Sequence, residues 1–265
     1  MKLLTLNTHS LMEKNYEKKL SVFVNAVKRH KFDVIALQEV MQPITDKPSK
    51  FSHINCGKIP LKSQNHALNI VSELESIGEK YNLVWCGFKR SYDRFDEGVA
   101  LLTPHRIEKT SDVTLTPFDD YENWKTRRAI GAKINGEWFY SIHMGWWDSF
   151  EYELARLIEE IDNKEQAWLM GDFNSVSSER GKGYDLMMDK GLFDTYNLAI
   201  NKDSGITAHT GIDGWSGEKQ EIRIDYILSN KSKDIESSFV IFNGVNEEIV
   251  SDHFGIIVTT RKEEE

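Results

Sequence analysis

Strand-like and helix-like patterns are mixed along this chain, and that mixture is the strongest constraint on its fold. In residues 129–144, AIGAKINGEWFYSIHM, two apolar runs flank Asn135-Gly136, which predicts a β-hairpin. Apolar residues spaced i, i+3, i+4 and i+7 from Leu20, Ala67 and Leu154 predict three helices, and Asn65 is a suitable N-cap for the second. Short apolar runs predict further strands at 3–7, 34–37, 83–88, 99–102, 167–170, 222–228, 238–242 and 254–260.

Strand–helix–strand units beside a hairpin favour an α/β protein whose sheets are covered by helices, and argue against a purely parallel fold. With 265 residues, of which 40% are hydrophobic, the chain can form a sizeable core. We predict a single domain over residues 1–261 and a solvated acidic tail at 262–265. Residues 41–64 and 204–220 read as long irregular loops, which are often functional or mobile.

Charge and composition narrow the functional classes. The formal net charge is −9, whereas proteins that bind duplex DNA usually present a basic face. No apolar stretch is long enough to span a membrane, and the first residues lack the apolar core of a signal peptide. Cys56 and Cys86 have no metal-like spacing and predict no disulfide. We therefore expect a cytoplasmic protein that acts on a small ligand, without membrane contact and with nucleic acid as the less favoured partner.

Polar residues recur where the predicted strands begin or end. Asp172 and Asn174 follow one apolar run, and residues i and i+2 of an extended segment point the same way. A lone pair of this kind is usually a polar turn, and a lone histidine is usually a hydrogen-bonded core residue. The whole set, however, consists of side chains suited to a metal–phosphate site: Asn7, Glu39, Glu97, His143, Asp172, Asn174, Asp225, Asp252 and His253.

This ordered set resembles the endonuclease/exonuclease/phosphatase superfamily, whose members include deoxyribonuclease I. The matching segments run in family order from residue 5 to residue 255: TLNTH, ALQEV, DEGVALL, SIHMGWW, GDFNS, RIDYIL and SDHFG. The resemblance implies a deoxyribonuclease I-like α/β fold, a four-layer sandwich of two packed mixed β-sheets flanked by helices. It also implies divalent-metal-dependent hydrolysis of phosphate esters at one end of the sandwich.

The resemblance assigns a metal-binding role to three residues. Glu39 matches the main metal ligand of the family, and Asn7 and Asp252 would complete or support its coordination. An oxygen-rich set suits Mg²⁺ or Mn²⁺ better than Zn²⁺, so ligation by histidine is not expected.

Three further residues match the groups around the attacked phosphorus. Asp172 matches the residue that orients or deprotonates the attacking water, and Asn174 would hydrogen-bond a phosphoryl oxygen. His253 matches the histidine that contacts the phosphoryl group. Whether Asp172 or His253 accepts the proton of the water stays open at this point.

Two carboxylates are implied to hold the two histidines. Asp225 would position His253, and Glu97 would orient the ring of His143, which would lie near the leaving group. A carboxylate partner fixes the tautomer of a histidine and raises its basicity.

The substrate is indicated less directly. Aromatic and basic residues in polar loops are candidates for substrate binding, although tryptophans are as often core residues and arginines can be solvated strand ends: Arg127, Arg128, Trp146, Trp147 and Trp215, with Trp124 nearby. The segment from Tyr121 to Trp147 resembles sugar-phosphate phosphatases of the superfamily, such as maltose 6′-phosphate phosphatase. We expect a phosphomonoesterase acting on a small soluble sugar phosphate.

Three alternatives stay open. A metal-dependent nuclease would need a continuous basic surface, and the lysines of residues 41–64 are scattered. A phosphodiesterase of phospholipid head groups would need export. A catalytically silent binding module should have lost at least one of the polar residues, and none is missing.

Overall fold

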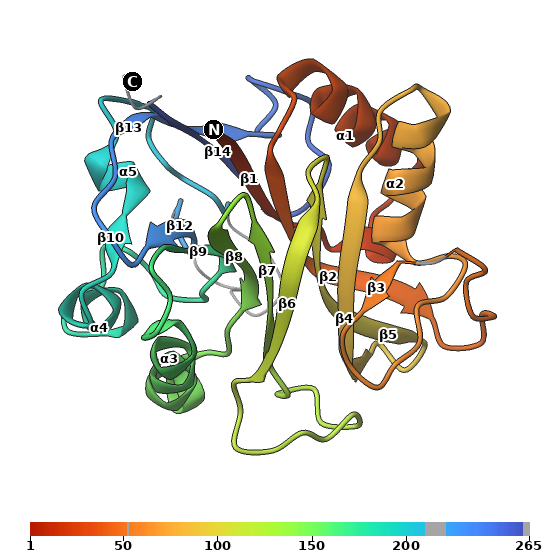
Figure 1. The fold of residues 1–265 in the computed structure, drawn as a ribbon, viewed down its shortest axis with the longest axis horizontal. Coiled ribbons are helices and arrows are strands. Elements are labelled where there is room, and N and C mark those ends of the chain that lie inside the picture. Colours follow the sequence, from red (N-terminus) through yellow and green to blue (C-terminus); the bar gives the residue numbers. More distant parts are fainter. Residues whose placement is uncertain (52, 210–220, 262–265) are drawn as a thin grey trace.

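The computed structural model describes residues 1–51, 53–209 and 221–261, which form two β-sheets packed face to face with helices outside (Figure 1). The helical elements in chain order are η1 (Ser10–Met12), α1 (Tyr16–His30), α2 (His66–Ser76), α3 (Trp147–Ile161), α4 (Gly183–Asp189) and α5 (Thr195–Leu198). The acidic tail expected at 262–265 lies outside the described residues. Among those described, no helix has the length and apolar character needed to cross a membrane.

The larger sheet has eight strands and combines parallel and antiparallel pairs. Its spatial order is β11 (Asn201–Lys202), β13 (Ile235–Ile241), β14 (Gly255–Thr260), β1 (Lys2–Asn7), β2 (Val34–Pro43), β5 (Phe95–Thr103), β4 (Asn82–Ser91) and β3 (Ile54–Asn55). β1 and β2 are parallel and joined by helix α1, whereas β4 and β5 form an antiparallel hairpin. The chain therefore places its first and last strands side by side at the centre of this sheet.

The smaller sheet has six strands in the order β10 (Phe193–Asp194), β12 (Asp225–Ser229), β9 (Ala167–Asp172), β8 (Glu137–His143), β7 (Arg128–Ile134) and β6 (Ile107–Thr114). The predicted hairpin is β7–β8, and Asn135 and Gly136 both take positive φ at its turn. β8 and β9 are parallel because helix α3 connects them, while β9 and β12 are antiparallel.

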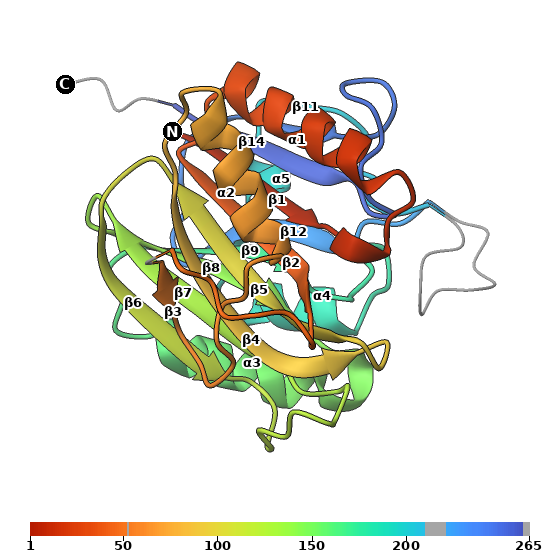
Figure 2. The same cartoon turned by 90° about the vertical axis from the view of Figure 1, so that its right-hand side faces the viewer.

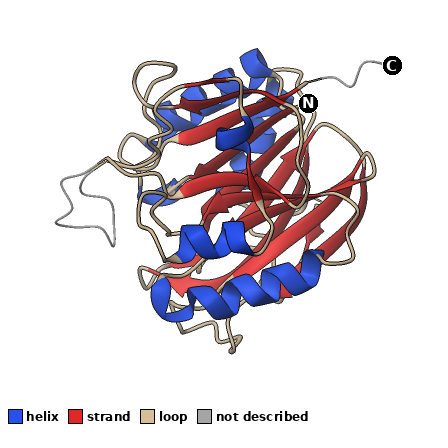
Figure 3. Ribbon diagram, turned by 90° about the vertical axis from the view of Figure 1, so that its left-hand side faces the viewer, coloured by secondary structure: helices blue, strands red, loops and turns tan. Residues whose placement is uncertain are grey.

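The sheets and helices form four layers, as Figures 2 and 3 show from two sides, and apolar clusters lie between the layers. One cluster packs α1 and α2 on the outer face of the larger sheet through residues such as Phe23 and Leu74. A second fills the space between the sheets, with Val99 and Met170 among its members. The third packs α3 and α4 on the smaller sheet, where Leu157 is fully buried. This arrangement confirms the predicted sandwich of two mixed sheets flanked by helices.

Several elements differ from the sequence-based expectations. β2 continues to Pro43, so Glu39 lies inside a strand, and Glu97 likewise lies inside β5. The stretch expected to be an irregular loop at 41–64 contains the end of β2, the short strand β3 and a bridge between Pro48 and Lys62. The edge strand β6 and the helices α4 and α5 were not predicted, because their exposed or short segments lack a clear apolar period.

Candidate active site

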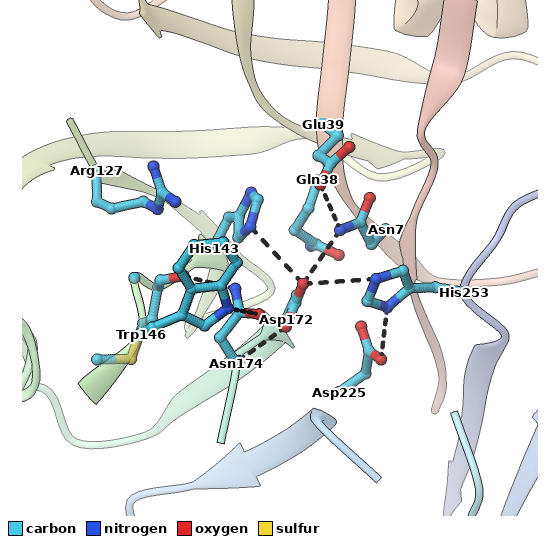
Figure 4. A network of polar contacts seen from close by, with 12 residues as sticks. Asn7, Gln38, Glu39, Arg127, His143, Trp146, Asp172, Asn174, Asp225 and His253 are labelled. Atoms are coloured by element: carbon cyan, nitrogen blue, oxygen red, sulfur yellow. Dashed lines mark hydrogen bonds and ion pairs between the residues drawn. The ribbon is translucent and has the colours of Figure 1, made fainter. Parts of the chain in front are cut away.

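Strand register gathers the polar residues at one end of the two sheets (Figure 4). His143, the last residue of β8, lies opposite Asp172, the last residue of β9. Asp172 in turn lies opposite Asp225, the first residue of β12. Asn7 ends β1 in the facing sheet. Four residues that are far apart in the sequence thus become neighbours because the strands that carry them end, or in the case of β12 begin, at the same edge.

Asp172 is the centre of a buried network of contacts. Its Oδ2 accepts a hydrogen bond of 3.1 Å from Asn7 Nδ2, and Oδ1 accepts one of 2.8 Å from the backbone N–H of Asn174. The same Oδ2 lies 3.7 Å from Nε2 of His143 and 3.9 Å from Nε2 of His253. Two imidazole rings and an amide therefore converge on one carboxylate oxygen.

His253 is held by Asp225 from its other side. Nδ1 of His253 lies 3.0 Å from Asp225 Oδ2, and both side chains are buried. Burial disfavours the charged ring, but the nearby carboxylates, Asp225 foremost, outweigh it and raise the pKa of His253 well above its ordinary value. Burial and the charge of Asp225 also raise the pKa of Asp172. The structure thus places Asp225 and His253 in contact, and their catalytic roles stay predictions.

Glu39 reaches the site through a β-bulge. The register between β2 and β5 shifts between Leu37 and Val40, and Glu39 has a φ of 49°, which is left-handed backbone. A bulge of this kind re-aims a side chain out of the regular alternation. Oε1 of Glu39 accepts a hydrogen bond of 3.0 Å from Asn7 Nδ2. Asn7 thereby links the carboxylates of Glu39 and Asp172.

The carboxylate set has the chemistry of a site for a hard cation. Burial raises the pKa of Glu39, and the negative charges of Glu97 and Asp252 raise it further. Among the described residues, two groups have ligand atoms within 4.8 Å of one another, close enough to hold a metal ion: Asp172, Asp225 and His253, and separately His9, Glu13 and Asp252. Neither group contains Glu39, and Asp252 lies with His9 and Glu13. Buried carboxylates that destabilise one another's charge are stabilised by a divalent cation, and oxygen donors are those that Mg²⁺ and Mn²⁺ prefer.

Asn174 enters the site by a different geometry from the one expected. The strand ends at Asp172, and Asn174 has a φ of 47°, so the two side chains are not related by extended-chain alternation. Asn174 Nδ2 donates to the carbonyl of Met144 at 2.9 Å, and its Oδ1 accepts from Trp146 Nε1 at 2.7 Å. Both Asp172 and Asn174 nevertheless line the same cavity.

The expected contact between Glu97 and His143 is not formed. Oε1 of Glu97 lies 2.9 Å from Nζ of Lys89, which is the residue opposite Glu97 on β4. His143 Nδ1 is buried and has no hydrogen-bond partner among the described residues. Burial and the positive charges of Arg127 and Lys89 lower the pKa of His143 well below its ordinary value. In this structure Glu97 therefore contacts Lys89 in place of the predicted partner His143.

A cavity of about 510 Å³ opens over this cluster. Glu39, His143, Asp172, Asn174 and His253 form its floor, and its walls include Lys89, Glu97, Trp124, Arg127, Trp146 and the turn from Arg90 to Asp93. The rings of Trp124 and Trp146 contact each other with centroids 5.8 Å apart. Trp124 is half exposed, at 52% of its accessible area, so the aromatic wall can receive a ligand.

The other substrate-binding candidates are not all in this wall. Arg128 is absent from the cavity lining, because it donates two hydrogen bonds to Asp112 and one to Asp119. We therefore correct the expectation that Arg128 grips a phosphate. Trp147 begins α3, but its side chain lies outside the described part of the structure. Trp215 lies outside the described residues altogether.

Sequence reasoning missed Lys89. It is buried and lines the cavity, yet it stands in a strand as one of many lysines of the chain. Only the β4–β5 register, which sets Lys89 opposite Glu97, distinguishes it from a solvated strand residue. In the sequence, only its place directly after the predicted strand at 83–88 distinguishes Lys89 from the other lysines.

Comparison with known proteins identifies the family. The sequence profile of the Endonuclease/Exonuclease/phosphatase family matches residues 4–253. An endonuclease/exonuclease/phosphatase family protein from Leptotrichia buccalis C-1013-b has 33% sequence identity and a TM-score of 0.89, with 99% of this chain and 100% of that chain covered. No curated protein gives a significant match.

Two more distant structures share the fold. The mannosyl-6-phosphatase of Bacteroides thetaiotaomicron VPI-5482 has 18% identity and a TM-score of 0.67, over 99% of this chain and 100% of that one. A 3′ phosphatase from Neisseria, bound to a product DNA hairpin, has 17% identity and a TM-score of 0.67 over the same shares. From the profile match and the Leptotrichia relative, the chain belongs to the endonuclease/exonuclease/phosphatase family, whose members are hydrolases.

Proposed function

We propose that this protein is a divalent-metal-dependent phosphomonoesterase that acts on a small soluble sugar phosphate. The observation that carries the proposal is the cavity of about 510 Å³ above the Asp172–His253 cluster. Its volume is in the range of small-ligand sites, about 300–1,000 Å³, and its lining combines aromatic rings with many charged and polar side chains. The net charge of −9 agrees with a small ligand better than with a DNA duplex.

The metal would be held by Glu39, with Asn7 and Asp252 in support. When bound, Mg²⁺ or Mn²⁺ would neutralise the phosphoryl oxygens and polarise the phosphorus for attack. The contact from Asn7 Nδ2 to Glu39 Oε1 fixes the carboxylate, and the same amide group donates to Asp172. Asn7 would therefore fix the position of the metal-binding carboxylate of Glu39 relative to the water-activating carboxylate of Asp172.

Asp172 is our candidate for the group that accepts the proton of the attacking water. The pKa of His253 is raised, so its ring holds its proton and is suited to donate to a phosphoryl oxygen instead. The pKa of Asp172 is also raised, which makes its carboxylate a stronger base than an ordinary aspartate. Asn174 would contact the phosphoryl group from the side of Trp146.

His143 would act near the leaving group as a neutral ring. Its lowered pKa and the absence of a carboxylate on Nδ1 favour an uncharged imidazole that donates from one nitrogen. Trp124 and Trp146 would provide a flat apolar surface for the sugar ring. Glu97, which pairs with Lys89, would contribute to the charge balance of the cavity.

The test is a panel of phosphate esters assayed with Mg²⁺ and Mn²⁺: hexose phosphates, nucleotides, inositol phosphates, phospholipids and supercoiled DNA. Release of inorganic phosphate from at least one sugar phosphate is expected. The KM for that substrate should change little with salt, because few cations contact a small phosphomonoester. Strongly salt-dependent DNA cleavage without phosphate release from any sugar phosphate would reject the proposal in favour of a nuclease.

A further inference from the structure

Arg127 is a buried cation that has no carboxylate partner within residues 1–51, 53–209 and 221–261. Its Nη1 donates to the backbone carbonyls of Trp124 and Thr126 at 2.8 and 3.1 Å. Its Nε is buried and has no hydrogen-bond partner among the described residues, which also contain no ion pair to its guanidinium. Buried charges are costly unless they are paired, so an unpaired guanidinium in a cavity wall is suited to an anion.

The acidic residue next to Arg127 is already engaged. Glu153 is close enough for the charge of Arg127 to affect its pKa. Its two carboxylate oxygens, however, accept hydrogen bonds from the backbone N–H of Gly145 and the hydroxyl of Ser149, at 2.7 and 2.6 Å. Glu153 therefore holds Gly145 and Ser149 at the start of α3, and it forms no ion pair with the guanidinium of Arg127.

Lys89 adds a second cation to the same wall. Its Nζ lies 3.4 Å from the carbonyl of Trp124, the group that also accepts from Arg127. Lys89 Nζ pairs with Glu97 Oε1 at 2.9 Å, whereas no ion pair to the guanidinium of Arg127 is found among the described residues. Burial and the charge of Arg127 lower the pKa of Lys89, as expected for two cations held close together.

Arg127 lies on the side of the cavity that carries His143, the residue proposed above to act near the leaving group. Figure 4 shows Arg127 beyond His143, on the side away from His253 and Asp225. No hydrogen bond or ion pair connects Lys89 or Arg127 with Asp172 or Asn7 in the described chain. Arg127 also lines an adjoining cavity of about 340 Å³ behind the Trp124–Trp146 pair, so there is room there for more than a phosphoryl group.

We propose that Arg127 and Lys89 form an anion subsite for the leaving group of the substrate. The substrate class that fits is a sugar phosphomonoester with a second phosphate or a carboxylate on the part that departs. Its sugar moiety, cyclic or open-chain, would contact Trp124 and Trp146, between the reacting phosphoryl group and the second anion. This inference rests on the proposed phosphomonoesterase function, which it makes more specific.

The kinetic test compares three hexose derivatives: glucose 6-phosphate, glucose 1,6-bisphosphate and 6-phosphogluconate. The kcat/KM of the wild type for at least one compound with a second anion should exceed that for glucose 6-phosphate by roughly tenfold or more, as for a charge-assisted hydrogen bond. In Arg127→Met this ratio should fall to about one. If the bisphosphate is the better substrate, the subsite takes a phosphate; if the phosphorylated acid is better, it takes a carboxylate.

Two further variants separate charge from local structure. Arg90→Met is the matched control, because Arg90 also lines the cavity but is paired with Glu122 at 3.1 Å. It should keep the wild-type ratio. Arg127→Lys keeps the charge and should keep most of the ratio even if the Trp124 loop shifts. Equal losses for all three substrates in Arg127→Met would overturn the proposal and place Arg127 at the transferred phosphoryl group.

A binding experiment makes the subsite testable without turnover. Calorimetric titration of the chelator-treated protein should give tighter binding of the preferred doubly anionic compound than of glucose 6-phosphate, and Arg127→Met should remove the difference. If no sugar phosphate is hydrolysed but this difference persists, the proposed function fails and the subsite stands. If sugar phosphates are hydrolysed while the wild type binds both ligands equally, the subsite fails alone.

Discussion

Several residues in this site hydrogen-bond to two partners at once. A substitution at one of them therefore disturbs both contacts. Asn7 donates to both Glu39 and Asp172, and Asp172 accepts from both Asn7 and the backbone of Asn174. The residue types were predictable from the sequence, because only oxygen donors and histidines recur at the strand ends. The contacts between these residues were not predictable from the sequence. Glu97 pairs with Lys89 and not with His143, and the positive φ of Asn174 changes the direction of its side chain.

Replacing either Asp172 or His253 should remove most of the activity, and the loss of stability should be small for Asp172. We expect kcat to fall by roughly 10²–10⁴ in Asp172→Asn and in His253→Gln, as is typical for lost acid–base groups. Asp172→Asn also removes a buried charge, so its thermal midpoint should move by only about a few degrees, whereas His253→Gln leaves Asp225 buried without its partner and should lower the midpoint more. Steady-state kinetics and thermal unfolding measure the two effects. Near-normal turnover in either variant would refute its assigned role.

At the scale of elements, close approach of strands β8 and β9 places the catalytic candidates. Apolar periodicity was enough to predict these strands and the β7–β8 hairpin, because each buries an apolar face. It could not predict that β2 continues past Glu39, because a bulge depends on pairing with β5, which is distant in the sequence. The same limit applies to the length of β5.

Gly171 allows the backbones of β8 and β9 to approach beside the site. A Cβ atom at this position would lie 1.9 Å from the carbonyl oxygen of Ile142. Gly171→Ala should therefore force the strands apart and lower the free energy of unfolding by about 1–3 kcal/mol, a typical cost of overpacking. It should also lower kcat, because the next pair in register is His143 with Asp172. Urea denaturation and kinetics would detect both, and an unchanged midpoint with unchanged kcat would contradict this geometry.

Helix α2 contains a buried histidine that should make the protein sensitive to acid. His66 is the first residue of the helix, and Nδ1 lies 2.9 Å from the hydroxyl of Tyr16. Burial lowers the pKa of His66 from 6.5 to about 3. Below pH 6.5 the unfolded chain therefore binds a proton that the folded chain does not, and stability falls with pH until about pH 3.

The size of this effect can be measured with one variant. Between pH 7.5 and pH 5, the lowered pKa of His66 should reduce the free energy of unfolding by about 2 kcal/mol. This follows because each pH unit below 6.5 costs about 1.4 kcal/mol. His66→Gln should lose less stability over that interval than the wild type by this amount. Urea denaturation of both proteins at the two pH values provides the comparison, in which other acid-titrating groups cancel. Parallel losses in the two proteins would show that His66 is not the cause.

For the whole molecule, the sequence predicted the four-layer architecture because the resemblance to a family extends over nearly the full chain. The profile match over residues 4–253 and the structure agree with that prediction. Substrate choice was harder to predict, since the cavity walls come from β4, β5 and the segments before β7 and α3. Their residues acquire a function only through the way these segments meet in space.

The relatives that share the fold act on different phosphate esters. The structures compared include a mannosyl-6-phosphatase and a 3′ phosphatase bound to DNA, each below 20% identity to this chain. The fold therefore does not determine the substrate. The features that separate the possibilities in this chain are the bounded cavity, its aromatic wall and the cations Lys89 and Arg127.

The central claim, hydrolysis of a phosphomonoester with a divalent cation held at Glu39, is tested most directly by a metal titration. Phosphate release from the best sugar phosphate of the panel would be measured after exhaustive chelation and then against increasing Mg²⁺, in the wild type and in Glu39→Gln. We predict no release without metal, recovery of the wild type with Mg²⁺, and a much higher metal requirement in Glu39→Gln. Full activity of the chelated wild type, or the same Mg²⁺ dependence in both proteins, would contradict the account.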